Sequence, residues 1–361
     1  MTTIQDVAAL AGVSVSSVSN VLNGRTERLG RETYRRVEEA IRQLNYRPNL
    51  VARQLKTGNA PLLGLLVPST ANPMFGELAV HVEKAASDQH GYRVLLGNTH
   101  RDQQQESRMF EDLLSQGVRG VILASSRTDE GHLNSAIERG LAVVSYDRGG
   151  SGEPDSRIDH VSPDNMKAAR LAVEHLVEQG HQRLALVTPD VKTISRTLKR
   201  AGFLDAVQAA GLAEQAQVIE GATSPDFGDS HLADVGYHLA ERIAAMAPRP
   251  TAIITINDMM ALGLMAGLQA AGLSVPKDIS VIGMDNLVMC AYVNPPLTSV
   301  DMPSADMARC MVDMLMQRLA QPDAPAREVL FQPTLVRRAS VAPPPAGAAG
   351  AAPRITRKKK A

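Results

Sequence analysis

Short β-rich runs alternate with amphipathic helical stretches from residue 61 to residue 339, and this alternation constrains the fold more than any other feature of the chain. The predicted strands are Leu62 to Val67, Arg93 to Leu96, Gly120 to Ala124, Ala142 to Tyr146, Leu184 to Thr188, Val218 to Glu220, Ala252 to Ile256 and Ser280 to Met284. The predicted helices include residues 74–90, 103–116, 164–179, 198–210, 231–246 and 258–271. Such alternation is typical of parallel sheets covered by helices on both faces, and roughly 280 residues favour two α/β lobes over one.

The first 47 residues have a different, all-helical pattern that predicts a helix-turn-helix. A first helix is indicated by apolar residues at helical spacing, which are Ile4, Val7, Ala8 and Ala11. Gly12 can take the positive φ that a tight turn requires, and Ser14 is placed to cap a second helix whose core side is Val18 with Val21 or Leu22. A third helix, about 31–44, completes the core with Tyr34, Val37, Ile41 and Leu44.

The outward side of the second helix carries short side chains, namely Val15, Ser16, Ser17, Ser19 and Asn20. Short side chains let a helix approach base edges in the major groove, where Asn can pair with adenine and Val can contact a thymine methyl. The sequence therefore predicts a DNA-binding head. The alternative is a three-helix interaction module without a DNA role.

Charge is segregated along the chain although the formal net charge is zero. Residues 1–60 carry a net charge of +4, residues 340–361 carry +5, and the region between them carries −9. A basic head on an acidic body suits a polyanion such as DNA at one end. The low-complexity segment 340–361, rich in Pro, Ala and Gly and ending in basic residues, is expected to be disordered, with or without a contribution to nonspecific DNA affinity.

Several other classes of protein are disfavoured by what the sequence lacks. Cys290 and Cys310 form no metal-ligand pattern, so no zinc site or disulfide framework is indicated, and a reducing cytoplasm is expected. No secretory signal or membrane-spanning run is found. A dinucleotide-dependent enzyme is the rival from another class, but the first strand is followed by Pro68-Ser69-Thr70-Ala71-Asn72-Pro73 instead of a glycine-rich phosphate loop. We expect neither enzyme activity nor a cofactor.

Several strings of the sequence carry a resemblance to one family. They are Ile4-Gln5-Asp6-Val7-Ala8, Ala11-Gly12-Val13-Ser14, Val18-Ser19, Val21-Leu22-Asn23-Gly24, Leu44-Asn45-Tyr46 and Pro48-Asn49. They resemble the lactose-repressor (LacI/GalR) family over nearly the whole chain, as far as about Ser340. The resemblance implies a helix-turn-helix headpiece (1–47), a hinge helix and linker (48–60) and a periplasmic-binding-protein-like core of two doubly wound lobes (61–339). Lobe 1 is expected at about 61–161 and 293–322, and lobe 2 at about 162–292 and 323–339.

The resemblance also assigns DNA contacts. Base reading falls to Val15, Ser16 and Asn20, and phosphate contact to Ser14, Ser17, Ser19 and Asn23, with Thr3 added to the DNA-binding set. In the hinge the implied contacts are Asn49, Ala52, Leu55 and Lys56. Two hinge helices of a dimer would lie in the minor groove, where Leu55 would wedge between base steps and kink the duplex.

The lobes are implied to hold a small-molecule effector between them. Its expected contacts are Phe75, Asp147, Arg148, Ser195, Lys199, Phe227, Asn257, Asp258, Asp285 and Asp301. Two residues depart from the family pattern: Lys199 replaces a usual arginine and Asp301 a frequent glutamine, with a Lys199–Asp301 contact as one way to retune the pocket. We expect a homodimeric repressor of a pseudo-palindromic operator controlled by a sugar. The alternatives are a purine or other metabolite, or an α/β enzyme fused to a DNA-binding head.

Overall fold

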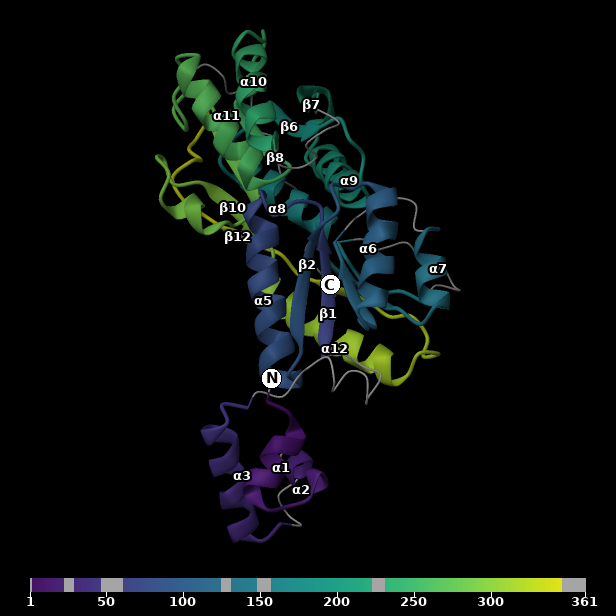
Figure 1. Cartoon of the computed structure of the whole chain (residues 1–361). Helices are drawn as coiled ribbons and strands as arrows, with labels where there is room; N and C mark the ends of the chain where they lie inside the picture. The colour runs from purple at the N-terminus through teal and green to yellow at the C-terminus, as the bar shows by residue number, and fades with distance from the viewer. Residues whose placement is uncertain are drawn as a thin grey trace, which may run out of the picture. The chain divides into compact units, whose positions relative to one another are not determined.

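The computed structural model of the chain describes residues 2–22, 29–46, 61–124, 131–147, 157–222 and 231–345 (Figure 1). It divides into two compact units, which we call the head (residues 1–60) and the body (residues 61–361). Among the described residues, none of the helices is both long and apolar enough to span a membrane.

The head contains the three helices that the sequence predicts, and their bounds are α1 Ile4–Ala11, α2 Val15–Leu22 and α3 Arg31–Gln43. Thr3 and Asp6 form a capping box at the start of α1, and Gly12 ends the helix with a left-handed φ of 62°. The fully buried residues of the core are Val7, Val18 and Val37. The prediction that Tyr34 belongs to this core is wrong. Tyr34 lies outside the core and its hydroxyl donates to Glu38 (2.7 Å), and Ala40 of α3 is buried instead.

The described residues of the body form two six-stranded sheets, in the two α/β lobes that the alternation of strands and helices predicts. The lobe 1 sheet has the order β11-β5-β4-β3-β1-β2, and all its pairs are parallel. Its strands are β1 Leu62–Val67, β2 Arg93–Asn98, β3 Gly120–Leu123, β4 Ala142–Tyr146, β5 Asp159–Pro163 and β11 Glu328–Phe331. Helices α5 Pro73–His90 and α12 Ser304–Ala320 share one hydrophobic cluster with its strands, and α6 Gln103–Ser115 and α7 Leu133–Glu138 share another.

The lobe 2 sheet has the order β12-β10-β9-β8-β6-β7, and only its edge strand β12 is antiparallel to its neighbour. Its strands are β6 Leu184–Pro189, β7 Ala216–Gly221, β8 Ala252–Thr255, β9 Ser280–Asp285, β10 Thr298–Asp301 and β12 Thr334–Val336. Helices α8 Asn165–Glu178 and α9 Ile194–Ala209 cover one face, and α10 Leu232–Ala244 and α11 Asp258–Ala270 cover the other. The first of these faces belongs to the same hydrophobic cluster as α5 and α12, so the two lobes share a continuous core.

The division of the last third of the chain between the lobes differs from the expectation. Residues 293–322 were assigned to lobe 1, but β10 pairs with β9 in the lobe 2 sheet, Thr298 opposite Ile282. Residues 323–339 were assigned to lobe 2, but β11 pairs with β5 in the lobe 1 sheet, Glu328 opposite His160. The chain therefore crosses between lobes after β10 and again between β11 and β12.

The prediction that disorder begins at residue 340 is also wrong, because the first residues of this segment pack against lobe 2. Ser340 is fully buried, and its hydroxyl donates to the carbonyl of Val281 (2.6 Å) and accepts from the amide of Thr298 (2.8 Å). The carbonyl of Ala342 lies 2.8 Å from Nε2 of the buried His181. Burial lowers the pKa of His181 to about 4, so this ring is neutral at physiological pH. Residues 346–361 of the expected tail lie outside the described residues.

Candidate functional site

The second helix of the head presents its serine-rich side as the sequence predicts. The hydroxyl of Ser14 accepts from the amide of Ser17 (3.2 Å), which caps α2, and lies 2.7 Å from the hydroxyl of Ser16. Val15 and Ser16 are exposed, with Val15 at 43%, whereas Ser17, Ser19 and Asn20 are half-buried. Val15 and Ser16 are therefore the most accessible of the proposed DNA contacts on α2.

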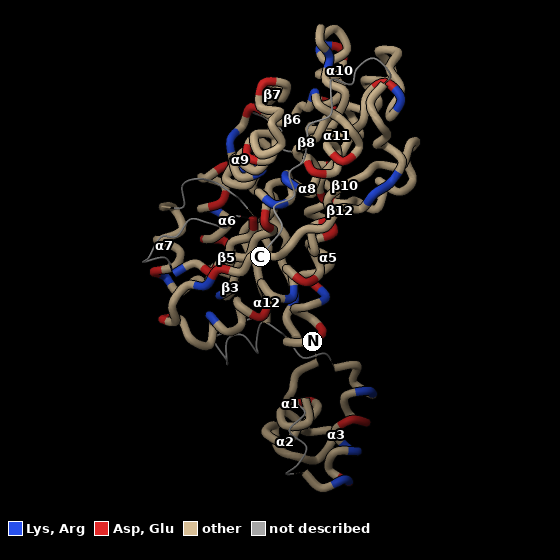
Figure 2. Tube along the Cα trace, turned by 180° about the vertical axis from the view of Figure 1, so that it is seen from behind, with Lys and Arg blue, Asp and Glu red and all other residues tan. Residues whose placement is uncertain are grey.

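Of the remaining proposed DNA contacts outside α2, one takes part in the cap of α1 and the others are not described by the structure. Thr3 is exposed, but its hydroxyl donates to the carboxylate of Asp6 (2.8 Å) as part of the α1 cap. Asn23, Asn49, Ala52, Leu55 and Lys56 lie outside the described residues. Helix α3 adds exposed arginines that the sequence analysis did not single out, and Figure 2 colours Lys and Arg blue along its Cα trace. They are Arg31, Arg35, Arg36 and Arg42. Helix α3 also carries Glu32, Glu38 and Glu39, so its net charge is only +1, and its exposed arginines rather than the helix as a whole suit a phosphate backbone.

The carboxyl ends of the parallel strands carry the acidic residues of the expected effector site. Asp147 follows β4 with a φ of 64°, and Asp285 ends β9 with a φ of 117°. Asp147 accepts from the side-chain amide of Asn165 (2.8 Å), the first residue of α8. Burial, and then the negative charges of Asp147, Asp285 and Glu77, raise the pKa of Tyr146. The carboxyl edge of parallel sheets is the usual ligand site of such folds.

Three other expected contacts are packed into the body. Phe75 is 4% exposed and belongs to the hydrophobic cluster that both lobes share. Lys199 is 8% exposed, and its ammonium group donates to the carbonyl of Ile256 (3.1 Å) just beyond β8. The hydroxyl of Ser195 lies 3.2 Å from that of Thr193. Arg148 and Phe227 lie outside the described residues.

The polar residues after β8 and at the end of β10 mainly form internal contacts. Asn257 caps α11 by accepting from the amide of Met260. The carboxylate of Asp258 accepts from the hydroxyl of Ser299 (2.6 Å), the amide of Leu287 (2.8 Å) and the thiol of Cys290 (3.1 Å). Asp301 accepts from the side-chain amide of Asn286 (2.9 Å). Lys199 and Asp301 are both among the described residues, and no hydrogen bond or ion pair joins them, so the structure does not contain the contact suggested between them.

The buried carboxyl of Asp258 predicts a pH dependence of stability. Burial raises its pKa from 3.8 to about 6, although the bonds from Ser299, Leu287 and Cys290 and the charge of Arg338 act in the opposite direction. Between these two pKa values the native protein binds a proton that the unfolded chain has released. The contribution of Asp258 to stability is therefore present at low pH and is lost as the pH rises through about 6.

The relevant quantity is the free energy of unfolding of the natural chain minus that of the Asp258→Asn variant. We expect this difference to fall by up to about 3 kcal/mol from pH 4 to pH 7. Urea unfolding of both proteins at each pH measures this difference, and the other carboxyls cancel because both proteins contain them. A difference that stays constant across this range would contradict the prediction.

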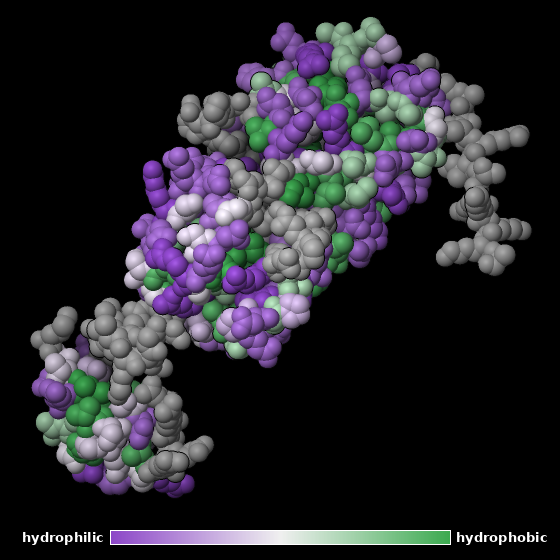
Figure 3. Space-filling view, turned by 90° about the vertical axis from the view of Figure 1, so that its right-hand side faces the viewer, coloured by the Kyte–Doolittle hydropathy of each residue, from purple (hydrophilic) through white to green (hydrophobic). Residues whose placement is uncertain are grey.

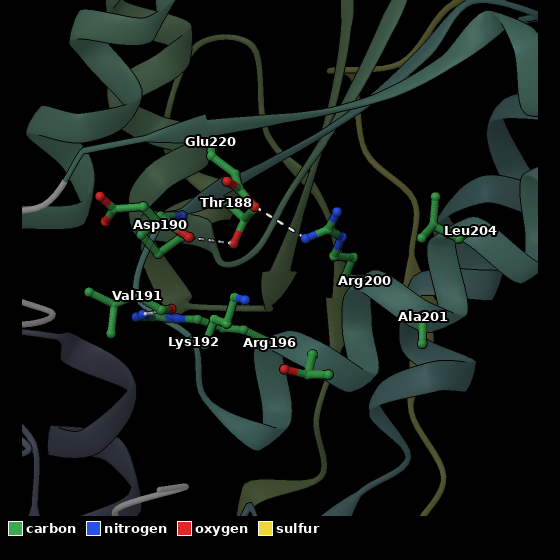
Figure 4. A pocket seen from close by; sticks show the side chains of 11 residues that line it. Thr188, Asp190, Val191, Lys192, Arg196, Arg200, Ala201, Leu204 and Glu220 are labelled. Carbon is green, nitrogen blue, oxygen red and sulfur yellow. Dashed lines mark hydrogen bonds and ion pairs between the residues drawn. The ribbon is translucent and has the colours of Figure 1, made fainter. Parts of the chain in front are cut away.

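The described residues also form a hollow of about 310 Å³ on lobe 2 (Figure 4). Its lining includes Lys192, Arg196 and Arg200, and Arg200 forms an ion pair with Glu220 (3.2 Å). It lies on the face of α9 opposite to Ser195 and Lys199, and none of the eight expected effector contacts that the structure describes lines it. The hollow is therefore separate from the expected effector contacts.

A helix-turn-helix head followed by a two-lobed α/β body, with acidic groups at the strand ends, defines a DNA-binding regulator of transcription. The model of bacterial regulatory proteins of the lacI family matches residues 3–49, and that of a periplasmic binding protein-like domain matches residues 173–341. The chain belongs to the lacI family.

Relatives and solved structures agree with this assignment. The HTH-type transcriptional repressor PurR of Aliivibrio fischeri (strain ATCC 700601 / ES114) is 34% identical over 350 residues, covering 94% of this chain and 98% of the relative. The lac repressor dimer bound to operator and the anti-inducer ONPF has a TM-score of 0.80 and 28% identity, covering 94% of this chain and 99% of that one. A LacI family regulator from Enterococcus faecium with bound ribose has a TM-score of 0.68 and 26% identity, covering 78% and 99%.

Proposed function

We propose that the protein is a homodimeric repressor in the cytoplasm that binds a pseudo-palindromic operator and responds to a sugar or sugar derivative held by the body. The placement of Asp147 and Asp285 carries the proposal. The two carboxylates follow β4 of lobe 1 and β9 of lobe 2, and both act on Tyr146. Carboxylates accept charge-assisted hydrogen bonds from hydroxyl groups such as those of a sugar. The related regulator with bound ribose supports this ligand class.

Exposed apolar side chains on the body support the homodimer. The largest exposed fractions belong to Val80 (62%), Val288 (73%) and Tyr292 (84%). Hydrophobic patches are visible among the hydrophilic surface of the body in Figure 3. Contiguous apolar patches, unlike single exposed apolar side chains, are typical of a contact between protein chains. The related lac repressor structure is a dimer on its operator.

The dimer would present two heads to the two halves of the operator. We assign base reading to Val15, Ser16 and Asn20 and a minor-groove wedge to Leu55 of the segment 48–60. A segment this short is marginal as a free helix, so we propose that it folds on DNA and that effector binding changes the spacing of the two copies.

A thermal-shift screen of the full chain with D-ribose, cellobiose and guanine tests the proposed effector class. A bound sugar at 100 times its dissociation constant is expected to stabilise the native protein by about 2.7 kcal/mol. Asp285→Ala is expected to lose this shift and the response of operator binding to the sugar, while binding the operator as the natural chain does. If the variant responds fully, Asp285 is not an effector contact. If only guanine shifts the unfolding temperature, the effector is a purine and not a sugar.

A further inference from the structure

The turn after β9 contains two consecutive residues in an unusual backbone conformation. Asp285 has a φ of 117° and Asn286 a φ of 56°, and neither is glycine. Asparagine accepts the left-handed region near 56° more readily than most residues, but a φ of 117° is costly for an aspartate and persists only where surrounding contacts hold it. Such conformations gather at binding sites, where the surrounding structure sets the position of a functional group.

Three hydrogen bonds of Asn286 help to hold this turn, beside the bond from the amide of Leu287 to Asp258 (2.8 Å). Its backbone amide donates to the hydroxyl of Ser299 (3.0 Å), and its side-chain amide donates to Asp301 (2.9 Å). Its side-chain oxygen accepts from the guanidinium of Arg338 (2.6 Å). Both ends of the side-chain amide are therefore bonded, one to β10 and one to the segment after β12.

The partners of Asn286 are themselves fixed. The guanidinium of Arg338 also donates to the carbonyl of Leu297 (2.7 Å), and the hydroxyl of Ser299 donates to the buried carboxylate of Asp258 (2.6 Å). A network in which each member has defined partners holds one geometry of the turn. Sequence reasoning assigned Asp258 and Asp301 to the effector itself, whereas here both support Asn286.

We propose that Asn286 is a positioning residue that holds the strained turn and so fixes the carboxylate of Asp285 in the effector site. Asp301 and Arg338 act through Asn286 and do not contact the effector. This inference rests on the proposed function, because it takes Asp285 as an effector contact.

The first test needs no ligand. A double-mutant cycle measures the unfolding midpoints of the natural full-length chain, Asp285→Gly, Asp301→Ala and the double variant. Glycine accepts a φ of 117° without strain, and its effect on the unfolded chain cancels in the cycle. We expect Asp285→Gly to change the unfolding midpoint more favourably in the natural chain than in the Asp301→Ala variant, and the two changes in midpoint should differ by about 2 °C or more. Equal effects in both backgrounds would overturn the proposal.

The second test uses isothermal titration of D-ribose and guanine, together with operator binding. Where the natural chain binds one of these probes, Asn286→Ala and Asp301→Ala are expected to weaken it about tenfold. Asp301→Asn keeps an oxygen that accepts from Asn286 and is expected to retain binding. Asn134→Ala, at an exposed position of α7, is the matched control.

The outcomes separate the two proposals. Loss of binding in Asp301→Asn as well as in Asp301→Ala would make Asp301 a direct contact and overturn its role through Asn286. Unchanged binding in Asn286→Ala would overturn the role of Asn286. If the natural chain binds neither probe, the result counts against the proposed effector classes. The double-mutant cycle of unfolding midpoints then tests by itself whether Asn286 holds the turn.

Discussion

Replacing Ser16 and Asn20 together by alanine is expected to lower the affinity of the full-length chain for its preferred operator by about 1,000-fold. Each lost base contact is worth about 1 kcal/mol or more, and a dimer loses four of them. Alanine keeps α2 helical, and the phosphate contacts remain. Affinity for a scrambled sequence should therefore change little.

Fluorescence anisotropy with the operator and the scrambled duplex, at two salt concentrations, measures this difference. Ser17→Ala is the matched control, because a lost phosphate contact weakens binding to both duplexes alike. Circular dichroism of the variants checks that the head stays folded. Equal loss on both duplexes in the Ser16 and Asn20 variant would contradict base reading by α2.

Replacing Asp159 by alanine is expected to lower the free energy of unfolding by about 3–5 kcal/mol. Asp159 is fully buried and forms ion pairs with Arg318 (3.0 Å) and Arg327 (3.2 Å). Burial raises the pKa of this carboxyl, but the hydrogen bonds from the two guanidinium groups outweigh burial and lower the pKa overall. The variant leaves Arg318, whose side chain is only 3% exposed, without its carboxylate.

Urea unfolding of the full chain measures this loss. The control is Asp306→Ala, which breaks an exposed pair with Arg309 on α12 and should cost less than about 1 kcal/mol. A similar small loss in both variants would show that the ion pairs of Asp159 with Arg318 and Arg327 contribute little to stability.

Periodicity was sufficient to predict the elements with long apolar runs. The structure has β1 over Leu62–Val67 and β4 over Ala142–Tyr146, as predicted, and the helices of the head agree closely. Strand β5 was missed because Asp159, His160 and Ser162 are polar but buried, which hides the strand pattern. The crossings between the lobes depend on the pairing of short strands, and hydropathy along the chain carries no information on that pairing.

The candidate site was predictable to a smaller extent. Acidic residues at strand ends can be located from sequence, as Asp147 and Asp285 show. The sequence does not reveal the direction in which a side chain at the start of a helix points. The carboxylate of Asp258 faces β9 because Gly283 has no Cβ, which would lie 2.1 Å from the Asp258 oxygen. The positive φ of Asn286 and its bonds to Asp301 and Arg338 depend on segments distant in sequence, so the turn could not be predicted.

The central claim is that the head reads a two-fold symmetric DNA sequence under the control of the body. Selection of duplexes from a random DNA pool by the full-length protein, with and without D-ribose, tests it most directly. The account predicts enrichment of one pseudo-palindromic sequence, bound by two chains, with recovery that changes when the sugar is added. Enrichment of no sequence, with binding that depends only on salt concentration, would contradict it.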